Sequence, residues 1–347
     1  MSLWWLLPIA VLVSGILTRS VRRYALSRSL LDTPNARSSH TVPTPRGGGV
    51  AIVVTFLLAL LLLIHAGALS MAAAIGLGGS GALVALIGFW DDHGHIPARW
   101  RLLGHFIAAF WGVFWLGSIH SFEVSPAFPF AEWLGYIVVA IALVWLLNLY
   151  NFMDGIDGIA SVEAVTVCIG ATICYWLSGF TGQAFVPLLL AASVLGFLFW
   201  NFPRARIFMG DAGSGFLGVT LGLLCLQAGW VAPQLLWAWL ILLGVFTVDA
   251  TWTLLRRLLN GEKVYEAHRS HAYQYATRRL GSHLYVTLSV AVINVFWLLP
   301  ISLLTAMDKI PALVGLLTAY IPLMLLAYAL DAGKQEHQED STAESKE

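Results

Sequence analysis

Charged residues and cysteines are scarce in this sequence of 347 residues. Lysine, arginine, aspartate and glutamate together make up 11% of the chain, whereas hydrophobic residues make up 59%. Because a soluble globular domain carries about 25% charged residues, this composition excludes an ordinary soluble protein. Cys168, Cys174 and Cys225 all lie within apolar stretches, which argues against a disulfide framework or a cysteine metal site. The formal net charge is zero, so nothing indicates a nucleic-acid partner.

The hydrophobic residues are gathered in long runs, and no internal repeat relates one run to another. A helix needs roughly 17 to 25 apolar residues to cross the hydrocarbon core of a bilayer, so the sequence predicts an all-α, polytopic integral membrane protein with about eleven transmembrane helices. They lie near residues 3–18, 48–68, 71–90, 102–118, 134–149, 160–178, 184–200, 214–230, 234–254, 284–304 and 310–330. The first run lacks a cleavage site, so we expect a retained span rather than a signal peptide. Residues 1–330 are predicted to form one membrane domain, and the polar tail 331–347 is predicted to be disordered.

Lysine and arginine are distributed unevenly among the predicted loops. With eleven spans, every lysine and arginine except Lys309 falls on the same side of the membrane. Loops rich in these residues stay in the cytoplasm, so that side is predicted to be cytoplasmic. Because the number of spans is odd, the N-terminus faces outside and the C-terminus faces the cytoplasm. A count that differed by one would break this partition, which favours eleven.

Aspartates gather in three short loops on the predicted cytoplasmic side. The segment GFWDDHGHIPARWR contains Asp91 and Asp92, NLYNFMDGIDGIA contains Asp154 and Asp157, and IFMGDAGSGFLG contains Asp211. Each has a plain structural interpretation, because Asp-Gly is a turn former and aspartate caps helices. Gathered together, however, these carboxylates would repel one another, and each would be costly to desolvate. A bound Mg²⁺ would offset that repulsion, because this ion prefers one or two carboxylates together with phosphate oxygens and water.

Glycines beside the same aspartates give a second indication. They let the backbone approach a phosphate closely, and two apolar helices are predicted to begin there with free N–H groups that face the cytoplasm. These glycines are Gly155, Gly158, Gly210, Gly213 and Gly215. Acidic residues, glycine turns, helix N-termini and a basic loop together predict phosphoryl transfer from a nucleotide-type donor.

Four motifs, in this order, resemble one family of membrane enzymes. They are GFWDD, NLYNFMDGIDG, FMGDAGSG and the HRSH segment of residues 268–271. From about Asp32 to Gln274 the chain is similar to the polyprenyl-phosphate N-acetylhexosamine-1-phosphate transferases, which start lipid-linked surface polysaccharides such as O-antigen. The resemblance implies that a UDP-N-acetylhexosamine gives its sugar-1-phosphate to undecaprenyl phosphate and that UMP leaves. It also implies an all-helical fold, Mg²⁺ or Mn²⁺ as the cofactor, and an active site on the cytoplasmic face of the bacterial inner membrane.

The resemblance also implies roles for individual residues. Asp211 matches the magnesium ligand of the family, and either Asp91 or Asp92 is expected to deprotonate or position the lipid phosphate. The other expected site residues are Asn151, Asp154 and Asp157, which orient the nucleotide and the reacting phosphates; Phe208, which lies against the uracil; and Arg46, Arg101 and Arg269, which bind substrate. Arg101 stands where many relatives have lysine, so the charge is kept but the geometry differs.

Three positions allow more than one interpretation. His268 and His271 depart from the His-x-His-His or triple-histidine segment of many relatives, and we expect them to contact phosphate or sugar. Asp249 lies inside a predicted span, where an ionisable group is either functional or bonded to a neighbouring helix or arginine. The PTPRGGG segment that contains Arg46 is either a breaker before a helix or a loop at the site.

Other functions remain alternatives at this stage. A transporter of lipid-linked sugar is disfavoured, because transporters place ionisable residues near the bilayer midplane and often contain inverted repeats. A CDP-alcohol phosphotransferase would need a long aspartate motif that the sequence lacks. Within the family, the phospho-MurNAc-pentapeptide translocase of peptidoglycan synthesis is the main alternative, and the missing triple histidine argues against it. The sequence leaves open which sugar is transferred (GlcNAc, FucNAc, QuiNAc or GalNAc) and whether the chain forms a homodimer.

Overall fold

The structure is a computed structural model that describes residues 3–34, 39–94, 96–117, 129–262 and 268–334. It is almost entirely helical, which confirms the predicted fold class. The α-helices are α1 (Leu6–Ser27), α2 (Val50–His65), α3 (Met71–His93), α4 (Ala98–Leu116), α5 (Pro129–Met153), α6 (Ile159–Leu177), α7 (Phe185–Asn201), α8 (Asp211–Val231), α9 (Pro233–Leu242), α10 (Gly244–Leu259), α11 (Ala272–Leu280), α12 (His283–Ile293), α13 (Leu299–Ala306) and α14 (Ala312–Ala329). Short 3-10 helices cover Leu3–Trp5 and Thr181–Gln183, and a π-helical turn, Asn294–Leu298, joins α12 to α13. Two short strands, β1 (Leu31–Asp32) and β2 (Thr44–Pro45), pair antiparallel.

The helices make this a multi-pass membrane protein. Within the described ranges, eight helical segments are each long and apolar enough to cross a bilayer, and α9 with α10 makes a ninth if the bent pair counts as one span. Of the two remaining predicted spans, α2 is a shorter apolar helix and α4 does not meet the same test. The count of eleven therefore stays a prediction, and most of the expected tail lies outside the described residues.

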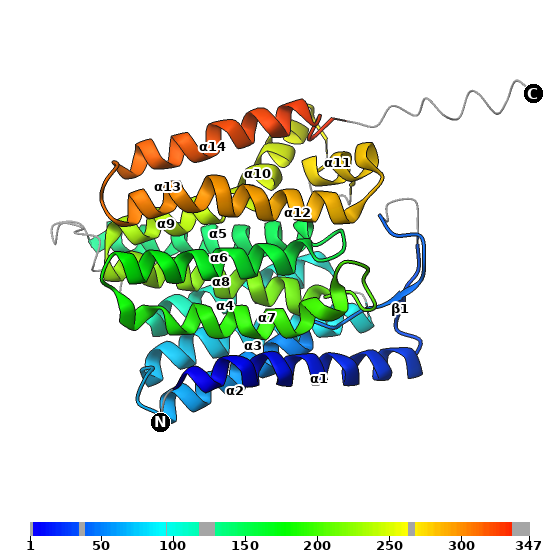
Figure 1. The fold of residues 1–347 in the computed structure, drawn as a ribbon, viewed down its shortest axis with the longest axis horizontal. Coiled ribbons are helices and arrows are strands. Elements are labelled where there is room, and N and C mark those ends of the chain that lie inside the picture. The colour runs from blue at the N-terminus through cyan, green and yellow to red at the C-terminus, as the bar shows by residue number, and fades with distance from the viewer. Residues whose placement is uncertain (1–2, 35–38, 95, 118–128, 263–267, 335–347) are drawn as a thin grey trace, which may run out of the picture.

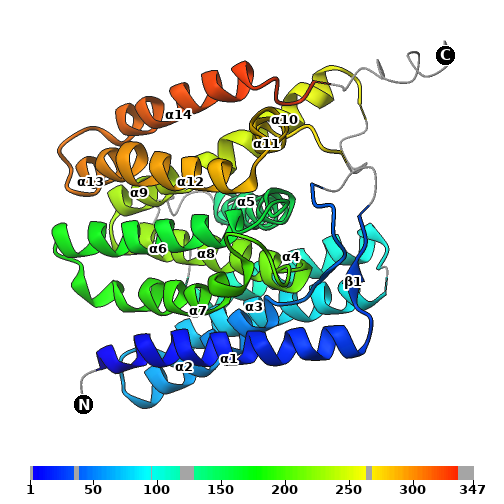
Figure 2. The same ribbon diagram turned by 45° about the vertical axis from the view of Figure 1, so that its right-hand side comes forward.

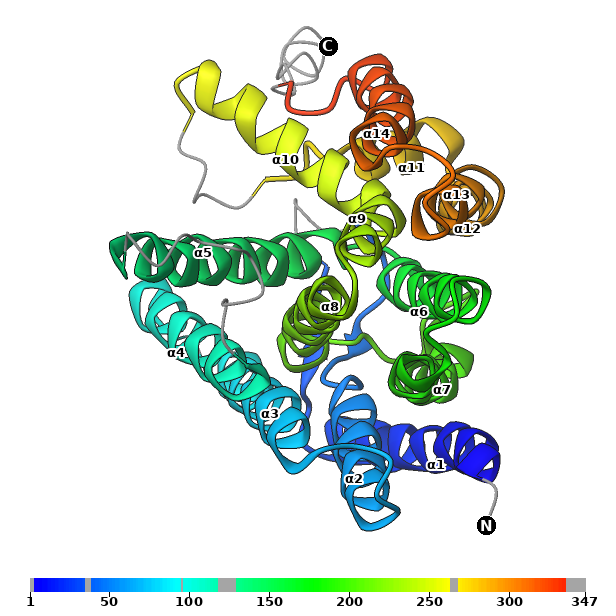
Figure 3. The ribbon, with the colours of Figure 1, turned by 90° about the vertical axis from the view of Figure 1, so that its left-hand side faces the viewer.

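Helix α8 lies at the centre of the bundle and packs against α3, α5 and α9 (Figure 3). Glycines bring its neighbours close, as is common between helices in membranes. A Cβ on Gly218 of α8 would lie 2.7 Å from the Cα of Leu147 in α5. A Cβ on Gly88 of α3 would lie 2.5 Å from the backbone nitrogen of Ala212. The last turn of α3 is thus held against the first turn of α8, where Asp211 stands.

Successive long helices run back and forth, so that α1 begins at one end of the bundle and α14 ends at the other (Figures 1 and 2). We call the second end the acidic end, because Asp91, Asp154 and Asp211 lie there. Its local structure differs from the prediction in two ways. Asp91 and Asp92 belong to the last turn of α3 rather than to a loop, and Asp211 is the first residue of α8.

The predicted span 234–254 is not one straight helix. The chain breaks at Leu243, and α9 and α10 are bent by 69° from each other. Helix α10 leans away from α5 and α8 beyond the break (Figure 3). The loop that follows contains α11, a helix that the sequence analysis did not predict. Its apolar residues are too few and its arginines too many for the run to stand out as a span.

Candidate active site

A cavity of about 230 Å³ opens at the acidic end of the bundle. It receives residues from loops and helix ends that are far apart in the sequence. Its lining includes seven of the predicted site residues, namely Arg46, Asn151, Asp92, Asp154, Asp157, Phe208 and Asp211. Asp91, Arg101, His268, Arg269 and His271 are not among its lining residues. Distant motifs of the sequence thus converge on one cavity, as the family resemblance implies.

Asp211 is the residue to which most of the cavity's polar groups connect. It stands in the first turn of α8, where the helix dipole favours a negative charge. Nδ2 of Asn151, at the end of α5, donates to Oδ1 of Asp211 at 3.0 Å and to Oγ of Ser214 at 2.9 Å. Nη1 of Arg101 lies 3.5 Å from the other carboxylate oxygen. Asn151 and Arg101 therefore fix the orientation of the Asp211 carboxylate from two sides.

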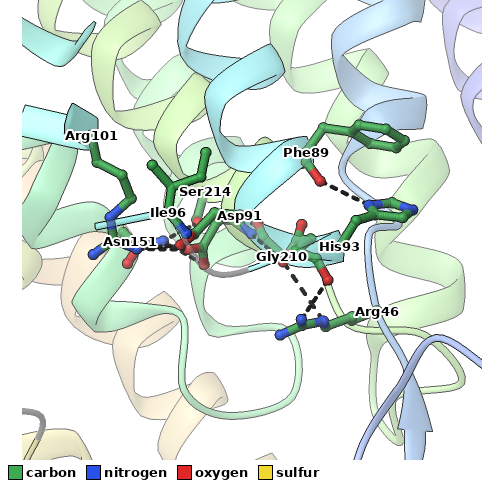
Figure 4. A network of polar contacts seen from close by, with 11 residues as sticks. Arg46, Phe89, Asp91, His93, Ile96, Arg101, Asn151, Gly210 and Ser214 are labelled. Atoms are coloured by element: carbon green, nitrogen blue, oxygen red, sulfur yellow. Dashed lines mark hydrogen bonds and ion pairs between the residues drawn. The ribbon is translucent and has the colours of Figure 1, made fainter. Parts of the chain in front are cut away.

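Asp91 and Asp92 are neighbours on α3, but their side chains have different surroundings. Asp91 accepts hydrogen bonds from the guanidinium of Arg101 and, at 2.8 Å, from the backbone nitrogen of Ile96 (Figure 4). Asp92 turns into the cavity, where Oδ1 lies 3.3 Å from the backbone nitrogen of Asp211 and 3.9 Å from Nε of Arg46. Its Oδ2 is buried and has no hydrogen-bond partner among the described residues. Of the two carboxylates, Asp92 is the one left free to meet a ligand.

Two close contacts hold the wall around Asp92. Arg46 donates a hydrogen bond to the backbone carbonyl of Asp92 (Figure 4), so the PTPRGGG segment is a loop at the site rather than only a helix breaker. Gly210 has φ 75°, and a Cβ there would lie 2.6 Å from Oδ2 of Asp92. Any other residue at Gly210 would be strained and would collide with the carboxylate.

Asp154 lies between the other acids, in the turn that joins α5 to α6. Burial, together with the negative charges of Asp211, Asp92 and Asp157, raises its pKa to about 7. The cavity therefore contains more negative charge than its own arginines neutralise. Such a site favours a cation or a proton.

Asp157 has a partner that the sequence analysis missed. Nδ1 of His283, the first residue of α12, lies 3.4 Å from Oδ1 of Asp157, and Nε2 of the same ring lies 3.0 Å from the carbonyl oxygen of Ser39. The hydroxyl of Thr287 donates to the backbone carbonyl of Asp157 at 2.9 Å. His283 begins an apolar run outside every motif, so no local pattern could have singled it out. Gln274 also lines the cavity and was missed for the same reason, whereas Ser214 stands inside the FMGDAGSG motif but was not singled out there.

The HRSH segment lies beside the cavity rather than in its wall. His271 is 2% exposed, and its Nδ1 lies 3.4 Å from Oδ1 of Asp249. Asp249 in turn accepts hydrogen bonds from the backbone nitrogens of Ala272 at 2.8 Å and Tyr273 at 3.0 Å. These contacts make Asp249 the cap of α11, which agrees with the structural interpretation of this residue. Gln274, one turn further on, is the member of α11 that lines the cavity.

His268 is partly buried next to His271, and their ring centroids are 4.9 Å apart. Burial lowers the pKa of His268 to about 3, and the neighbouring His271 and Arg257 act in the same direction. The ring is therefore neutral at physiological pH, and it can donate or accept one hydrogen bond but not offer a positive charge. The roles predicted for His268, His271 and Arg269 stay predictions.

Phe208 and His40 lie next to each other in the lining of the cavity. Their ring centroids are 4.8 Å apart in an edge-on arrangement, and the backbone nitrogen of Phe208 donates to the carbonyl of Pro45 at 2.8 Å. Both side chains also line a wider groove of about 960 Å³ that runs past Arg204 and Arg206. Phe208 thus offers an aromatic surface at the point where the cavity opens.

Comparison with known proteins identifies the family. A family model described as glycosyl transferase family 4 matches residues 74–229. The probable undecaprenyl-phosphate N-acetylglucosaminyl 1-phosphate transferase of Bacillus subtilis (strain 168) is 30% identical over 76% of this chain and 74% of its own length. The chain belongs to glycosyl transferase family 4. It is therefore a transferase, and the family predicted from the four motifs is confirmed.

Two further relatives show the range of this glycosyl transferase family. The decaprenyl-phosphate N-acetylglucosaminephosphotransferase of Mycolicibacterium smegmatis is 29% identical over 78% of this chain and 75% of that protein. The phospho-N-acetylmuramoyl-pentapeptide-transferase of Chlamydia muridarum is 32% identical, but over only 52% of this chain and 59% of its own length. The similarity to N-acetylglucosamine-1-phosphate transferases thus extends over more of the chain.

Proposed function

We propose that this protein transfers an N-acetylhexosamine-1-phosphate, with N-acetylglucosamine as the first candidate sugar, from a UDP-sugar to undecaprenyl phosphate. The observation that carries the proposal is the convergence of Asp92, Asp154 and Asp211, with Arg46 and Arg101 beside them, at the end of a membrane bundle. The names of the relatives support a polyprenyl phosphate as the acceptor. A cavity at the membrane surface suits a reaction between a water-soluble donor and a lipid acceptor.

The reaction requires little from the protein beyond position and charge. A phosphate oxygen of the acceptor attacks the β-phosphorus of the donor, the bond from that phosphorus to the bridging oxygen breaks, and UMP leaves. The second pKa of a phosphomonoester is about 6, so much of the acceptor is already ionised at neutral pH. A general base is therefore worth only a modest factor, and most of the rate must come from orientation and charge neutralisation.

The residues present fit a magnesium ion. Asp211 and the unpartnered Oδ2 of Asp92 would hold it, and Asp154 adds uncompensated negative charge nearby. Among the described residues no three histidine, cysteine, aspartate or glutamate side chains stand close enough to form a complete metal site. That is in keeping with Mg²⁺, which takes one or two carboxylates and completes its shell with phosphate oxygens and water. When bound, the ion supplies positive charge to the phosphates.

The remaining groups have separate tasks in this proposal. Arg101 orients Asp211 and Asp91, and Arg46 supports the backbone at Asp92 while its charge attracts the phosphates. Phe208 lies against the uracil, because an aromatic ring at the cavity mouth suits a planar base. Asp157, oriented by His283, accepts a hydrogen bond from the UDP-sugar. The acidic end faces the cytoplasm of the bacterial inner membrane, where UDP-sugars are found, and the lipid product starts a surface polysaccharide.

The proposal is tested by incubating the purified protein in lipid nanodiscs with undecaprenyl phosphate and a panel of UDP-sugars. We expect one N-acetylhexosamine donor to yield a lipid product whose mass corresponds to undecaprenyl diphosphate plus the sugar, together with UMP in equal amount. A reaction only with UDP-MurNAc-pentapeptide would assign the protein to peptidoglycan synthesis instead. Recovery of every UDP-sugar and of undecaprenyl phosphate unchanged, with no UMP and no new lipid, would contradict transferase activity.

A further inference from the structure

The five residues that follow α14, 330–334, form an ordered turn at the acidic end of the bundle; we call them the C-terminal clasp. Ala332 is fully buried and packs with Ala272 of α11 and Ala327 of α14. Asp331 and Gly333 have φ values of 62° and 76°, so the backbone is left-handed at both positions of the clasp. This conformation brings residues at the far end of the described chain back onto the loop that contains the HRSH segment.

Two arginines hold the clasp from opposite sides. Nη1 of Arg256, on α10, donates to the carbonyl of Ala332 at 3.0 Å. Arg279, on α11, donates to the carbonyl of Ala329 at 3.1 Å and to the carboxylate of Asp331 at 2.6 Å. The hydroxyl of Tyr275 donates to the carbonyl of Lys334 at 2.9 Å. The clasp therefore joins α10, α11 and α14 at the acidic end of the bundle.

One hydrogen bond connects the clasp to the HRSH segment. The backbone nitrogen of Gly333 donates to the carbonyl of Ser270 at 2.8 Å. The hydroxyl of Ser270 in turn lies 3.0 Å from Nδ1 of His268. The backbone nitrogen of Ser270 lies 3.4 Å from the same ring nitrogen, so the clasp binds the residue whose backbone and hydroxyl both meet the His268 ring.

Only glycine fits at position 333. Its φ of 76° lies in the left-handed region, and a Cβ there would lie 2.9 Å from both Cβ of Arg256 and the carbonyl oxygen of Thr253. The clasp could not keep its hydrogen bond to Ser270 with a larger residue at this position. If the clasp only filled space, position 333 would need neither a positive φ nor such close contacts with Arg256 and Thr253.

We propose that Gly333 is a positioning residue, which acts through Ser270 to hold His268 in the orientation that the transfer reaction needs. This inference rests on the proposed function. The described part of the loop offers His268 few other anchors. The carbonyl of Arg269 accepts a hydrogen bond from Arg278 at 3.1 Å, and the backbone nitrogen of His271 donates to the side chain of Gln274 at 3.2 Å. The bond that the clasp supplies, from Gly333 to the carbonyl of Ser270, lies between these two along the chain.

The test compares Gly333→Ala with Gly67→Ala, both in nanodiscs. Gly67 also has a positive φ, of 68°, but a Cβ there meets nothing within 4 Å, and it follows α2 at the end away from the cavity. The control therefore carries similar backbone strain without touching the clasp. Hydrogen exchange, followed by mass spectrometry of peptides that cover 268–276, reports on the segment without any reference to activity. A third variant, Ser270→Ala, removes the hydroxyl that meets His268 and leaves the backbone bond in place.

We expect Gly333→Ala to lose protection at 268–276 and to lose about tenfold to a hundredfold in kcat, because small displacements of a positioned group have effects of that size. KM for the UDP-sugar should change little. Ser270→Ala should keep the hydrogen-exchange protection of residues 268–276 but lose kcat with little change in KM. Gly67→Ala should resemble the wild type in both measurements. Unchanged exchange in Gly333→Ala would overturn the inference, as would lost protection with an unchanged kcat. A wild type without transferase activity would instead refute the proposed function, while the exchange experiment would still decide whether the clasp holds the segment.

Discussion

Two places at the acidic end of the bundle put an aspartate beside the first turn of a helix, and they use it differently. At the junction of α10 and α11, both carboxylate oxygens of Asp249 accept backbone N–H groups of α11, and the hydroxyl of Thr253 lies 3.2 Å from one of them. In the cavity, Asp211 begins α8 and meets other acids instead. There Oδ2 of Asp92 has no partner among the described residues, and Asp154 has a raised pKa.

We infer from this difference that Asp249 stabilises the fold, whereas the cavity acids are arranged to bind a ligand. A buried polar group normally has its hydrogen bonds satisfied within the protein, and one that does not costs free energy. Asp249 follows this rule, so its removal should destabilise the protein. Among the cavity acids, Oδ2 of Asp92 violates it, and the repulsion between Asp154 and the other carboxylates adds an electrostatic cost, so removing one of these acids should cost activity and little or no stability. Proteins commonly show this opposition between stability and function at active sites.

The largest effect is expected for Asp211→Asn. The substitution keeps the size of the side chain and one acceptor oxygen but removes the charge that would hold Mg²⁺ in the proposed function. Because a bound metal ion supplies several kcal/mol to such a transition state, turnover should fall by about a thousandfold. The thermal midpoint Tm should stay within a few degrees of the wild type. Turnover is measured as lipid product formed in nanodiscs, and full activity of the wild type in EDTA would contradict the role of Asp211.

A smaller loss is expected for Arg101→Ala, which leaves the Asp91 carboxylate without its guanidinium partner and Asp211 with one fewer. Turnover should fall by roughly ten- to a hundredfold, since a charged hydrogen bond contributes about 1.5 to 3 kcal/mol. Arg101→Lys should recover only part of the loss, because lysine supplies the charge without the planar fork. Equal activity of the alanine and lysine variants would show that the charge of Arg101 is not what matters.

Asp249→Ala is expected to lower the stability of the protein more than its turnover. Loss of a helix cap costs about 1 to 2 kcal/mol, and the backbone nitrogens of Ala272 and Tyr273 would become unsatisfied. The Tm should therefore fall by several degrees, while kcat of the remaining folded protein should fall less than about tenfold. Thermal unfolding and turnover measured on the same preparation decide this. A loss of turnover without a loss of Tm would place Asp249 with the cavity acids.

The sequence predicted the fold class and most of the long helices, because runs of apolar residues report directly on membrane burial. It did not predict the break at Leu243 or helix α11. The break falls at Leu243, just before Gly244, and the apolar run continues past it, so the hydrophobic pattern did not reveal the bend. Helix α11 has local end signals, a capping contact between His271 and Gln274 and Gly281 after its last residue, but they are weak, and its other cap, Asp249, lies on another helix.

The sequence also located the cavity, because its acids and glycines occur in short dense motifs. It could not separate Asp91 from Asp92, since their difference arises from the direction in which α3 presents each side chain. Nor did it find His283 or Gln274, which reach the cavity only because α11 and α12 begin at the same end of the bundle. Ser214 was missed although it stands inside the FMGDAGSG motif, because nothing in that motif distinguishes its hydroxyl from the neighbouring glycines.

The smallest effect concerns the stability of the cavity when no metal is present. The ordinary pKa of an aspartate is 3.8, and burial together with the nearby carboxylates raises that of Asp154 to about 7. Between these two values the folded protein binds more protons at Asp154 than the unfolded chain does. The contribution of Asp154 to the free energy of unfolding must therefore fall as the pH rises from about 4 to 7, and it stays low above that.

Asparagine at position 154 does not titrate, so the free energy of unfolding of Asp154→Asn should not show this fall as the pH rises. In EDTA its Tm should exceed that of the wild type by a few degrees at pH 8, and the difference should shrink towards pH 5 as Asp154 regains its proton. Adding Mg²⁺ at pH 8 should stabilise the wild type more than the variant, because the ion offsets the repulsion only where the charge exists. Asp249→Asn serves as the control and should show no gain at pH 8, since its carboxylate already has N–H donors. Parallel Tm curves for wild type and Asp154→Asn from pH 5 to 8 would mean that Asp154 does not share the charge of the cavity, and the contrast with Asp249 would then rest on Asp92 and Asp211 alone.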